Sequence, residues 1–374
     1  MNSTQTVSWD NETGQHTAVW QSEGQHTPPK NVIVADDFTT ADAAYLEACA
    51  GTGLLYQGDF QNAKQLLSAL TRRVDRNRLK RGVTWRDTFH KHRARQIGRA
   101  NIINKVLVEL VDGKCGLGRA PDVQEAVEHA LGGPVRGSVV LSLRELTGIL
   151  GAFEWRRKGV YLSSLDARIH ADYGVYSPVR GEYLKLIHEA PLNSPAVAWD
   201  IGTGTGVIAA ILAHRGVPEV IATDISDRAI TCAANNFERL AIQDKVSLVS
   251  TSLFPEGKAN LIVCNPPWLP AKATSSIEQA VYDPKSQMLK GFLGEVAQHL
   301  HPEGEAWLVM SDLAEIIGLR SENDLSNWIT DSGLVVAEKR STVPVHGKAN
   351  DRSDPLFHVR SKEVTSLYRL KAAS

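Results

Sequence analysis

Cysteine is scarce in this chain, and the positions of the few cysteines exclude most cysteine-based sites. The 374 residues contain four, at positions 49, 115, 232 and 264. No two of them form a CxxC pair or the ligand spacing of a zinc site, so we expect no metal centre built on cysteine. Scattered single cysteines are typical of proteins from a reducing compartment, which predicts a cytoplasmic protein.

Long apolar runs and an excess of charge of one sign are also missing. No apolar stretch reaches the roughly 20 residues that span a bilayer, and the polar residues after Met1 do not form a secretion signal. Lysine and arginine number 41 against 42 aspartates and glutamates, which gives a net charge of -1. The chain as a whole therefore has no general attraction to nucleic acid or membranes, and any electrostatic contact has to come from local clustering.

The sequence does contain enough apolar material, 43% of its residues, for one large core or two of medium size. Residues 1–36 are polar and lack a period, which predicts a flexible tail. Residues 37–150 place apolar side chains three and four apart, which predicts a helical N-terminal domain. Residues 151–190 predict a connecting segment, hairpin-like or extended at first, that ends in a helix.

The rhythm changes in residues 191–374, where short apolar runs alternate with helical patterns. The runs are "AVAWDIG", "EVIATDI", "VSLVSTS", "ANLIVCN" and "EAWLVMSD". Such alternation is typical of a parallel sheet with helices on both faces. We therefore predict an α/β domain here.

A glycine-rich turn follows the first of these runs, in "WDIGTGTG". Glycines at 202, 204 and 206 would let the backbone approach a ligand closely at the start of a helix. A turn of this kind is also found in sites for NAD or FAD, but the spacing here is GxGxG rather than GxGxxG. Asp200 before the first glycine would repel a pyrophosphate and suits the amino group of an amino acid.

A second acid, Asp224, closes the next run, about 20 residues further on, where a carboxylate can accept both hydroxyls of a ribose. Together with the glycine turn, this predicts a nucleoside ligand that carries no phosphate.

The stretch "ANLIVCNPPWLPA" ends an apolar run with an amide, two prolines and a tryptophan. The side-chain oxygen of Asn265 and the carbonyl of Pro266 could accept hydrogen bonds from an NH2 group and aim its lone pair. Pro267 would stiffen the loop, and Trp268 offers a flat apolar face for a base or an amide. A simple strand terminator with a core aromatic is the alternative reading of these residues alone.

These motifs in this order resemble the class I S-adenosylmethionine-dependent methyltransferases, over roughly residues 172–374. The resemblance is to the group that contains the release-factor glutamine methyltransferases and the "small" methyltransferase domains, here with an NPPW motif. It implies a Rossmann-like sheet that is mostly parallel, with the last strand antiparallel. It also implies S-adenosylmethionine as cofactor and S-adenosylhomocysteine as product.

The resemblance assigns roles residue by residue. The catalytic edge would be Asn265, Pro266, Pro267 and Trp268. The cofactor would be bound by the glycine turn, by the acid after the second strand, by the turn after the third, by Asn265, and by residues of a covering segment at 173–183. These residues are Asp200, Gly202, Thr203, Gly204, Gly206, Asp224, Ile225, Ser252, Leu253, Asn265, Tyr176, Pro178 and Arg180. Many family members have an acid near the adenine amine, whereas this chain has Ser252 in "STSLF".

The acceptor of the methyl group is left open by these motifs. Residues 71–105 contain twelve lysines or arginines against two aspartates, a local surplus that could contact nucleic acid or an acidic protein through the N-terminal domain. The same pattern also fits a helix whose arginines simply face water. The polar segment 346–362, with His346, Arg352 and His358, is either a loop beside the substrate or an exposed connection. A small nitrogen-containing metabolite and a non-catalytic cofactor-binding scaffold are the alternatives to a macromolecular acceptor.

Overall fold

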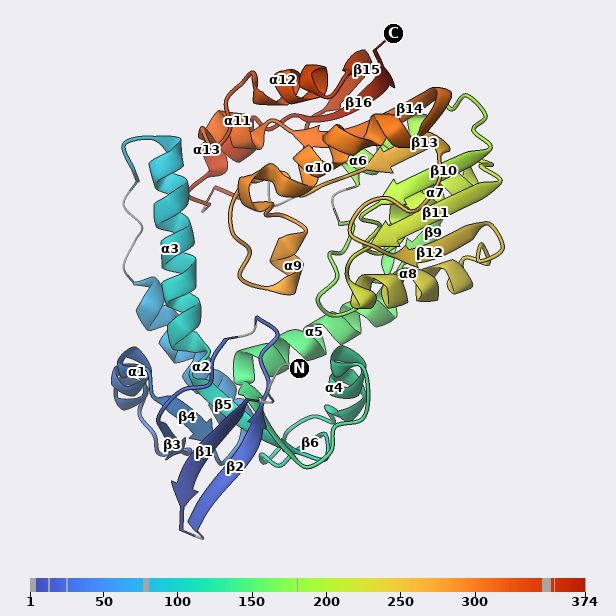
Figure 1. Cartoon of the computed structure of the whole chain (residues 1–374). Helices are drawn as coiled ribbons and strands as arrows, with labels where there is room; N and C mark the ends of the chain where they lie inside the picture. The colour runs from blue at the N-terminus through green and yellow to red at the C-terminus, as the bar shows by residue number, and fades with distance from the viewer. Residues whose placement is uncertain are drawn as a thin grey trace. The chain divides into compact units, whose positions relative to one another are not determined.

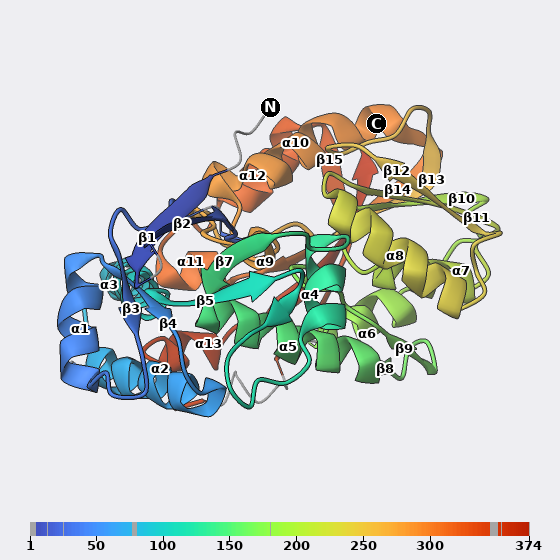
Figure 2. The ribbon, with the colours of Figure 1, turned by 90° about the horizontal axis from the view of Figure 1, so that it is seen from below.

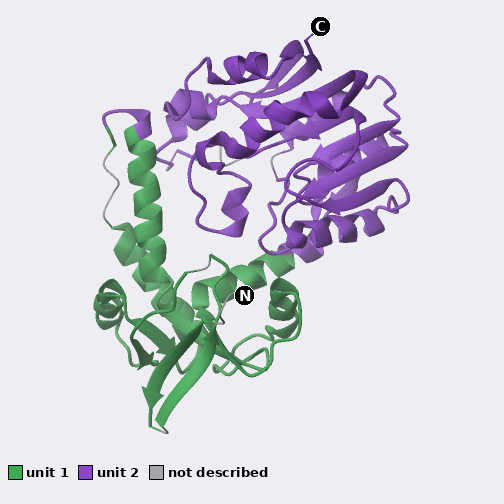
Figure 3. Cartoon of the chain, in the orientation of Figure 1, with its two compact units in different colours: residues 1–82, 87–154 green, residues 83–86, 155–374 purple. Residues whose placement is uncertain are grey.

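The structure is a computed structural model that describes residues 5–12, 14–24, 26–76, 81–179, 181–344, 351–352 and 354–373. The chain forms two compact units, shown in different colours in Figure 3. The first comprises residues 1–82 and 87–154, and the second comprises residues 83–86 and 155–374.

The first unit is built on a mixed sheet rather than on helices alone. Its strands run in the order β1-β2-β7-β5-β4-β3, and β6 pairs with β5. Strands β3, β4 and β5 are parallel, whereas β7 is antiparallel to β5. The strands are β1 (Thr6–Asn11), β2 (Gly14–Trp20), β3 (Val32–Ala35), β4 (Gly53–Tyr56), β5 (Val106–Val111), β6 (Lys114–Cys115) and β7 (Ser138–Ser142). The helices are α1 (Ala41–Ala50), α2 (Phe60–Asp75), α3 (Trp85–Ile103), α4 (Gln124–Leu131) and α5 (Leu143–Lys158).

The predicted tail at residues 1–36 was wrong, because this stretch contains β1, β2 and β3. The hairpin β1–β2 buries Val7, Trp9 and Ala18 on one side and exposes polar residues on the other. In β1 and β2 the exposed side chains are polar, and the buried apolar ones are few, so the composition of the segment is that of a polar tail. The alternation of Val7 with Trp9 covers too few residues to show the period of two that indicates a strand.

The prediction of a helical domain at 37–150 did not include the strands that lie between its helices. The strands β4, β5 and β7 are mainly apolar runs of four to six residues, and most of their side chains are buried, as at Leu54, Leu107 and Leu141. Periodicity alone cannot distinguish so short a run from a buried turn of helix.

The second unit contains the predicted Rossmann-like sheet. Its strands run in the order β12-β11-β10-β13-β14-β16-β15. All neighbours from β12 to β14 are parallel, and β16 lies antiparallel between β14 and β15. The expected antiparallel last strand is thus confirmed. The strands are β10 (Val197–Ile201), β11 (Glu219–Asp224), β12 (Val246–Ser250), β13 (Ala259–Cys264), β14 (Leu300–Ser311), β15 (Leu334–Thr342) and β16 (Thr365–Ala372).

Helices cover both faces of this sheet (Figure 1 and Figure 2). Alternate residues of β10 face opposite ways: Ala198 packs with α6, α7 and α8, whereas Trp199 packs with α10 and α12. The α/β helices are α6 (Glu182–Glu189), α7 (Val207–His214), α8 (Asp227–Arg239), α10 (Gln287–Val296) and α12 (Asp324–Asp331). Shorter elements of the unit are the hairpin β8 (Val160–Leu162) and β9 (Ala167–Ile169), the helices α9 (Ser276–Gln279), α11 (Leu313–Ile317) and α13 (Phe357–Arg360), and the 3-10 turns η1 (Pro284–Ser286) and η2 (Ala297–His299).

The strand order fixes where a ligand can bind. From β10 the chain moves to β11 on one side of the sheet and later to β13 on the other, so the loops that follow these strands diverge. In open α/β sheets the crevice outside the carboxyl ends of such strands is the usual binding place.

Candidate functional site

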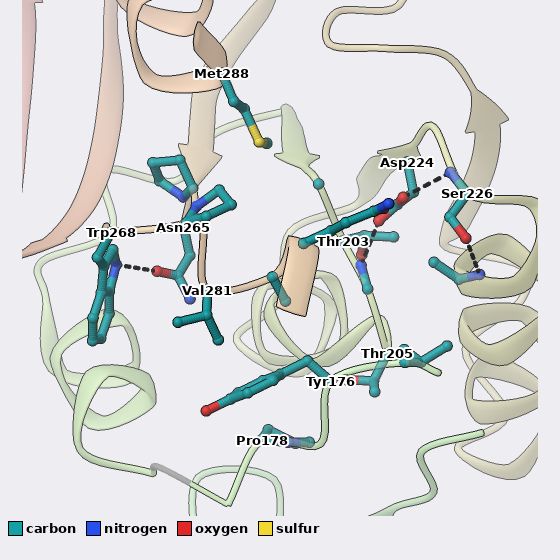
Figure 4. Close-up of a pocket in the computed structure, with 18 of the residues that line it drawn as sticks. Tyr176, Pro178, Thr203, Thr205, Asp224, Ser226, Asn265, Trp268, Val281 and Met288 are labelled. Carbon is teal, nitrogen blue, oxygen red and sulfur yellow. Dashed lines mark hydrogen bonds between the residues drawn. The ribbon is translucent and has the colours of Figure 1, made fainter. Parts of the chain in front are cut away.

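A cavity of about 280 Å³ lies at the carboxyl ends of β10, β11 and β13, entirely within the second unit (Figure 4). It brings together most of the site residues predicted from sequence. Those that line it are Tyr176, Pro178, Gly202, Thr203, Gly204, Asp224, Ile225, Ser252, Asn265, Pro266, Pro267 and Trp268.

The three glycines of the turn have positive φ angles but different surroundings. A Cβ atom on Gly204 (φ +56°) would meet nothing within 4 Å, so the backbone there borders open space. A Cβ on Gly206 (φ +80°) would lie 2.5 Å from the ring of Phe237 in α8, so this glycine is needed for close packing. Gly204 is therefore the position at which a ligand can approach the backbone most closely.

Asp200 lies beneath the turn and does not line the cavity. Its side chain is fully buried, and its Oδ2 accepts hydrogen bonds from the hydroxyl of Thr203 (2.6 Å) and the backbone N–H of Ala209 (3.0 Å). Burial raises the pKa of this carboxyl to about 7, and the two hydrogen bonds oppose that rise. The expected contact of Asp200 with an amino group is thus replaced by a supporting role for the glycine turn.

Asp224, at the end of β11, is partly exposed and lines the cavity. Its Oδ2 accepts a hydrogen bond from the backbone N–H of Gly204 (3.0 Å), and its Oδ1 accepts one from Ser226 (2.9 Å). Both oxygens keep a second lone pair for a ligand. The neighbouring Ile225 is 72% exposed and adds an apolar surface to the same wall.

The two predicted residues in the turn after β12 have different surroundings. Ser252 lines the cavity, as predicted. Leu253 is outside the cavity wall, and its carbonyl accepts a hydrogen bond from the hydroxyl of Thr223 (2.7 Å). This bond ties the turn to β11.

The segment before α6 forms a further wall. Tyr176 and Pro178 line the cavity from this segment (Figure 4). Val175, in the same segment, and Tyr183, in α6, line it as well. The predicted cofactor contact Arg180 lies outside the described residues.

The NPPW stretch forms the far side of the cavity, directly after β13. The indole N–H of Trp268 donates a hydrogen bond to Oδ1 of Asn265, at 3.0 Å. Burial raises the pKa of Tyr183 well above its usual value, and a hydrogen bond with the Asn265 side chain lowers it in part. The predicted hydrogen-bonding oxygen of Asn265 therefore already has a donor within the chain.

Comparison with known families shows what this part of the chain is similar to. The model of the methyltransferase small domain family matches residues 168–319. A ribosomal protein uL3 glutamine methyltransferase from Neisseria gonorrhoeae is 26% identical over 165 residues, which cover 41% of this chain and 52% of that protein. A release factor glutamine methyltransferase from Rhodopirellula baltica is 34% identical over 151 residues, which cover 39% of this chain and 44% of that protein.

The chain spans about half the length of the curated relatives it matches. Among solved structures, a methyltransferase from Pyrococcus furiosus shares 19% sequence identity, covers 61% of this chain and 98% of its own, and gives a TM-score of 0.39.

The same part of the chain contains cavity residues that the motifs did not reveal. Residues 269–283 form a loop between the NPPW stretch and η1, and backbone hydrogen bonds between Leu269 and residues 281 and 283 close it at its base. We call residues 270–282 the strap. It carries α9 and lines the cavity through Ser276, Gln279, Ala280 and Val281. Nothing in its polar sequence marks these positions, because their place depends on how the loop closes.

Two further cavity residues come from outside these motifs. Met288, at the start of α10, reaches the glycine turn, since a Cβ on Gly202 would lie 2.7 Å from its methyl group. Arg360, in α13, lines the cavity and has its Nε 2.8 Å from a carboxylate oxygen of Asp354, an ion pair without hydrogen-bond alignment. Arg360 belongs to the segment 346–362 suspected from sequence.

The residues proposed earlier within that segment have other positions. Arg352 and His358 are exposed and outside the cavity wall, and His346 lies outside the described residues. Among the residues that the structure describes, no cluster of histidine, cysteine, aspartate or glutamate could hold a metal ion. No helix in the same part of the chain is long and apolar enough to cross a membrane.

Proposed function

We propose that this protein is an S-adenosylmethionine-dependent N-methyltransferase that acts on a planar nitrogen, an amide or a base amine, of a protein or nucleic acid. The observation that carries the proposal is the meeting of Gly204, Asp224 and the NPPW stretch around one cavity. Each of these features has a separate use in methyl transfer, and they come from three different strand ends.

The cavity residues fit S-adenosylmethionine. Asp224 would accept the ribose hydroxyls, because its two oxygens are held by backbone N–H groups and retain free lone pairs. The open space at Gly204 would admit the amino acid portion, and Ile225 and Ser252 would border the adenine. Bound there, the cofactor supplies a methyl group on a positively charged sulfur and leaves as S-adenosylhomocysteine.

The NPPW stretch would position the acceptor nitrogen. A backbone carbonyl such as that of Pro266 can accept a hydrogen bond from an NH2 group and so direct the nitrogen lone pair toward the methyl carbon. The same interaction strengthens as positive charge develops on the nitrogen, which is what lowers the barrier. After transfer, the methylated nitrogen releases a proton to water.

The macromolecular acceptor is favoured by the basic segment 71–105, although internal ion pairs use part of its charge. Arg73 pairs with Asp42, and Arg95 and Arg99 both pair with Asp75. Lys91 pairs with Asp87. Exposed cations along the segment include Arg72, Arg76 and Arg86. Cations of this kind bind phosphates, and they would also attract an acidic protein. The names of the relatives favour a protein of the translation apparatus.

Two alternatives remain distinct from this proposal. A small nitrogen-containing metabolite would be methylated equally well by a variant in which Arg72 and Arg76 are replaced by alanine. A non-catalytic cofactor-binding scaffold would bind S-adenosylmethionine and transfer nothing. The intact sequence Asn265, Pro266 and Pro267 at the cavity favours catalysis over the scaffold.

The first experiment is calorimetric titration of the full chain with S-adenosylmethionine and S-adenosylhomocysteine. It is followed by transfer of a labelled methyl group to ribosomal proteins, release factors and RNA. We expect wild type to bind and transfer, Asp224→Ala not to bind, and Asn265→Ala to bind without transfer. If wild type binds neither ligand, the proposed function is wrong.

A further inference from the structure

One arginine lines the cavity without belonging to any of the motifs. The side chain of Arg360, in α13, is 17% exposed and forms an ion pair with Asp354. Its Nε–H is buried and lacks an aligned hydrogen bond within the described part of the chain, and a guanidinium carries further N–H donors on its two terminal nitrogens. A cation that is largely removed from water needs oxygen partners. The cavity wall therefore offers guanidinium donors to an anionic group of a ligand.

The fold places Arg360 with the NPPW stretch rather than with the ribose contact. Just after α13, the backbone N–H of Val364 donates to Oδ1 of Asp312 at 2.7 Å, and the N–H of Asp312 donates to the carbonyl of Val364 at 3.1 Å. These bonds attach the chain after α13 to the end of β14. In the sheet, β14 lies next to β13, which leads into the NPPW stretch, whereas Asp224 ends β11 on the other side of β10. Arg360 is therefore on the side where the acceptor would bind.

A second cation lies close to α13. Residues 83–86 belong to the second unit, and the ring centroids of Trp85 and His358, in α13, are 6.3 Å apart. The next residue, Arg86, is exposed, and its Cβ lies 4.0 Å from the position that a Cβ on Gly318 would take, directly after α11. The helices α11 and α13 lie side by side (Figure 1). Cations are thus present both in the cavity wall and on the surface beside α13.

The same cavity contains an aromatic face. Trp268 lines it and is only partly buried. Sites for single-stranded nucleic acid combine aromatic faces for the bases with cations for the backbone. A glutamine side chain brings no charge and would leave the guanidinium of Arg360 facing a neutral group. Every nucleotide in a strand carries a phosphate, so a base that enters the cavity brings an anion with it.

We propose that Arg360 is a phosphate-binding residue of the acceptor site, and that the acceptor is a base amine of a nucleic acid. This rests on the proposed function and narrows its acceptor from protein or nucleic acid to nucleic acid. The base would lie against Trp268. Arg360 would bind a phosphate next to the methylated nucleotide, and Arg86 would bind a phosphate further along the strand.

The first measurement identifies the class of acceptor with the full chain. Labelled S-adenosylmethionine and wild-type protein are added to an extract of cells that lack the gene, and the product is digested with nuclease or with protease. We expect nuclease to release the label and protease to leave it in place. Label that only protease releases overturns the inference and leaves the proposed function standing. If wild type binds no S-adenosylmethionine, or labels neither fraction, the proposed function is wrong and the inference fails with it.

The second measurement determines kcat/KM for the labelled nucleic acid at several salt concentrations. We expect Arg360→Gln to lower kcat/KM about tenfold and to reduce the slope of log(kcat/KM) against log salt by about 0.7, the contribution of one phosphate contact in a single strand. Arg360→Lys keeps the charge and should keep the slope. The matched control is Lys245→Gln, which removes an exposed cation just before β12, at the end of the sheet opposite the cavity, and should change neither quantity. An unchanged slope in Arg360→Gln contradicts the inference.

The third measurement is made on wild type, so it does not depend on the folding of a variant. Each phosphate around the methylated nucleotide is replaced in turn by an uncharged methylphosphonate. We expect one replacement to lower kcat/KM about tenfold, and the same replacement to cause no further loss in Arg360→Gln. If no single phosphate affects kcat/KM in wild type, Arg360 does not bind a phosphate and the inference is wrong.

Discussion

The backbone N–H of Gly204 donates a hydrogen bond to Oδ2 of Asp224 at 3.0 Å, which joins the turn after β10 to the end of β11. The two residues lie 20 positions apart in the sequence. This bond adds to those from Gly202 and Thr203 to the carbonyl of Thr223, which hold the turn on β11, and to the bond from Ser226, which orients the carboxylate. Any ligand that uses one of these residues is placed relative to the other.

Replacing Asp224 with alanine should abolish the binding of S-adenosylhomocysteine without unfolding the domain. Hydrogen bonds to a charged group contribute about 1.5 to 3 kcal/mol each, so losing two predicts a loss of affinity of at least 100-fold. Isothermal titration calorimetry measures it. The control is Asp227→Ala, whose carboxylate bonds to Ser250 outside the cavity wall. If both variants lost the same affinity for S-adenosylhomocysteine, the proposal that Asp224 contacts this ligand would be wrong.

Alanine at Gly204 and at Gly206 should have opposite consequences. A methyl group at 206 would overlap the ring of Phe237, so Gly206→Ala should lower the melting temperature strongly. Gly204→Ala has open space around its Cβ and should cost only the positive φ, about 1 to 2 kcal/mol. Its main effect should be weaker cofactor binding. Thermal unfolding and calorimetry on the two variants separate these effects, and a Gly204→Ala protein with normal affinity would contradict the assignment.

Asp200 should make stability depend on pH in a direction opposite to that of most carboxylates. Its pKa is raised from 3.8 to about 7, so the folded state holds a proton that the unfolded state has released. The stabilisation is complete below about pH 4 and is lost as the pH rises toward 7, by about 4 kcal/mol at 1.36 kcal/mol per pKa unit. Urea unfolding of wild type and Asp200→Asn between pH 4 and pH 8 isolates this term. A stability difference that does not change with pH would contradict the raised pKa.

Arg360 should affect the acceptor more than the cofactor, because it comes from α13 and not from the strand ends that form the proposed cofactor site. We expect Arg360→Gln to leave S-adenosylhomocysteine affinity within about twofold and to lower kcat/KM about tenfold, as for one lost charge-assisted hydrogen bond. Steady-state kinetics with the acceptor found by labelled methyl transfer measures this. Arg352→Gln, an exposed neighbour in sequence, is the control. A loss of cofactor affinity in Arg360→Gln would place the guanidinium at the cofactor instead.

The sequence was most informative where one short stretch of chain determines the geometry. The positions of Gly204 and Asp224 at the cavity follow from a strand, a turn and a helix in immediate succession, and the structure agrees. The NPPW stretch could be found for the same reason. Asp200 was assigned to the correct turn, but its side chain points beneath it, and the direction of a side chain at a strand end cannot be read from spacing.

The sequence was least informative where several segments have to meet. The strap reaches the cavity because Leu269 pairs with the chain near Tyr282, and no local pattern announces that closure. Arg360 arrives from a short helix more than 90 residues after Asn265. In the first unit, short runs such as β4 and β5 become strands because they pair with neighbouring strands. Their own sequences do not show this pairing, so only the longer helices were predicted there.

The position of β16 has a consequence for how the second unit is made. This strand, Thr365–Ala372, lies between β14 and β15 and joins β15 to the rest of the sheet. During synthesis on the ribosome, β15 emerges before β16, the strand with which it pairs. The backbone N–H and C=O groups of β15 therefore stay unpaired until β16 has been made. The sheet can therefore close only after residue 372 has been translated, so a nascent chain stalled before Thr365 would be a target for chaperones and proteases.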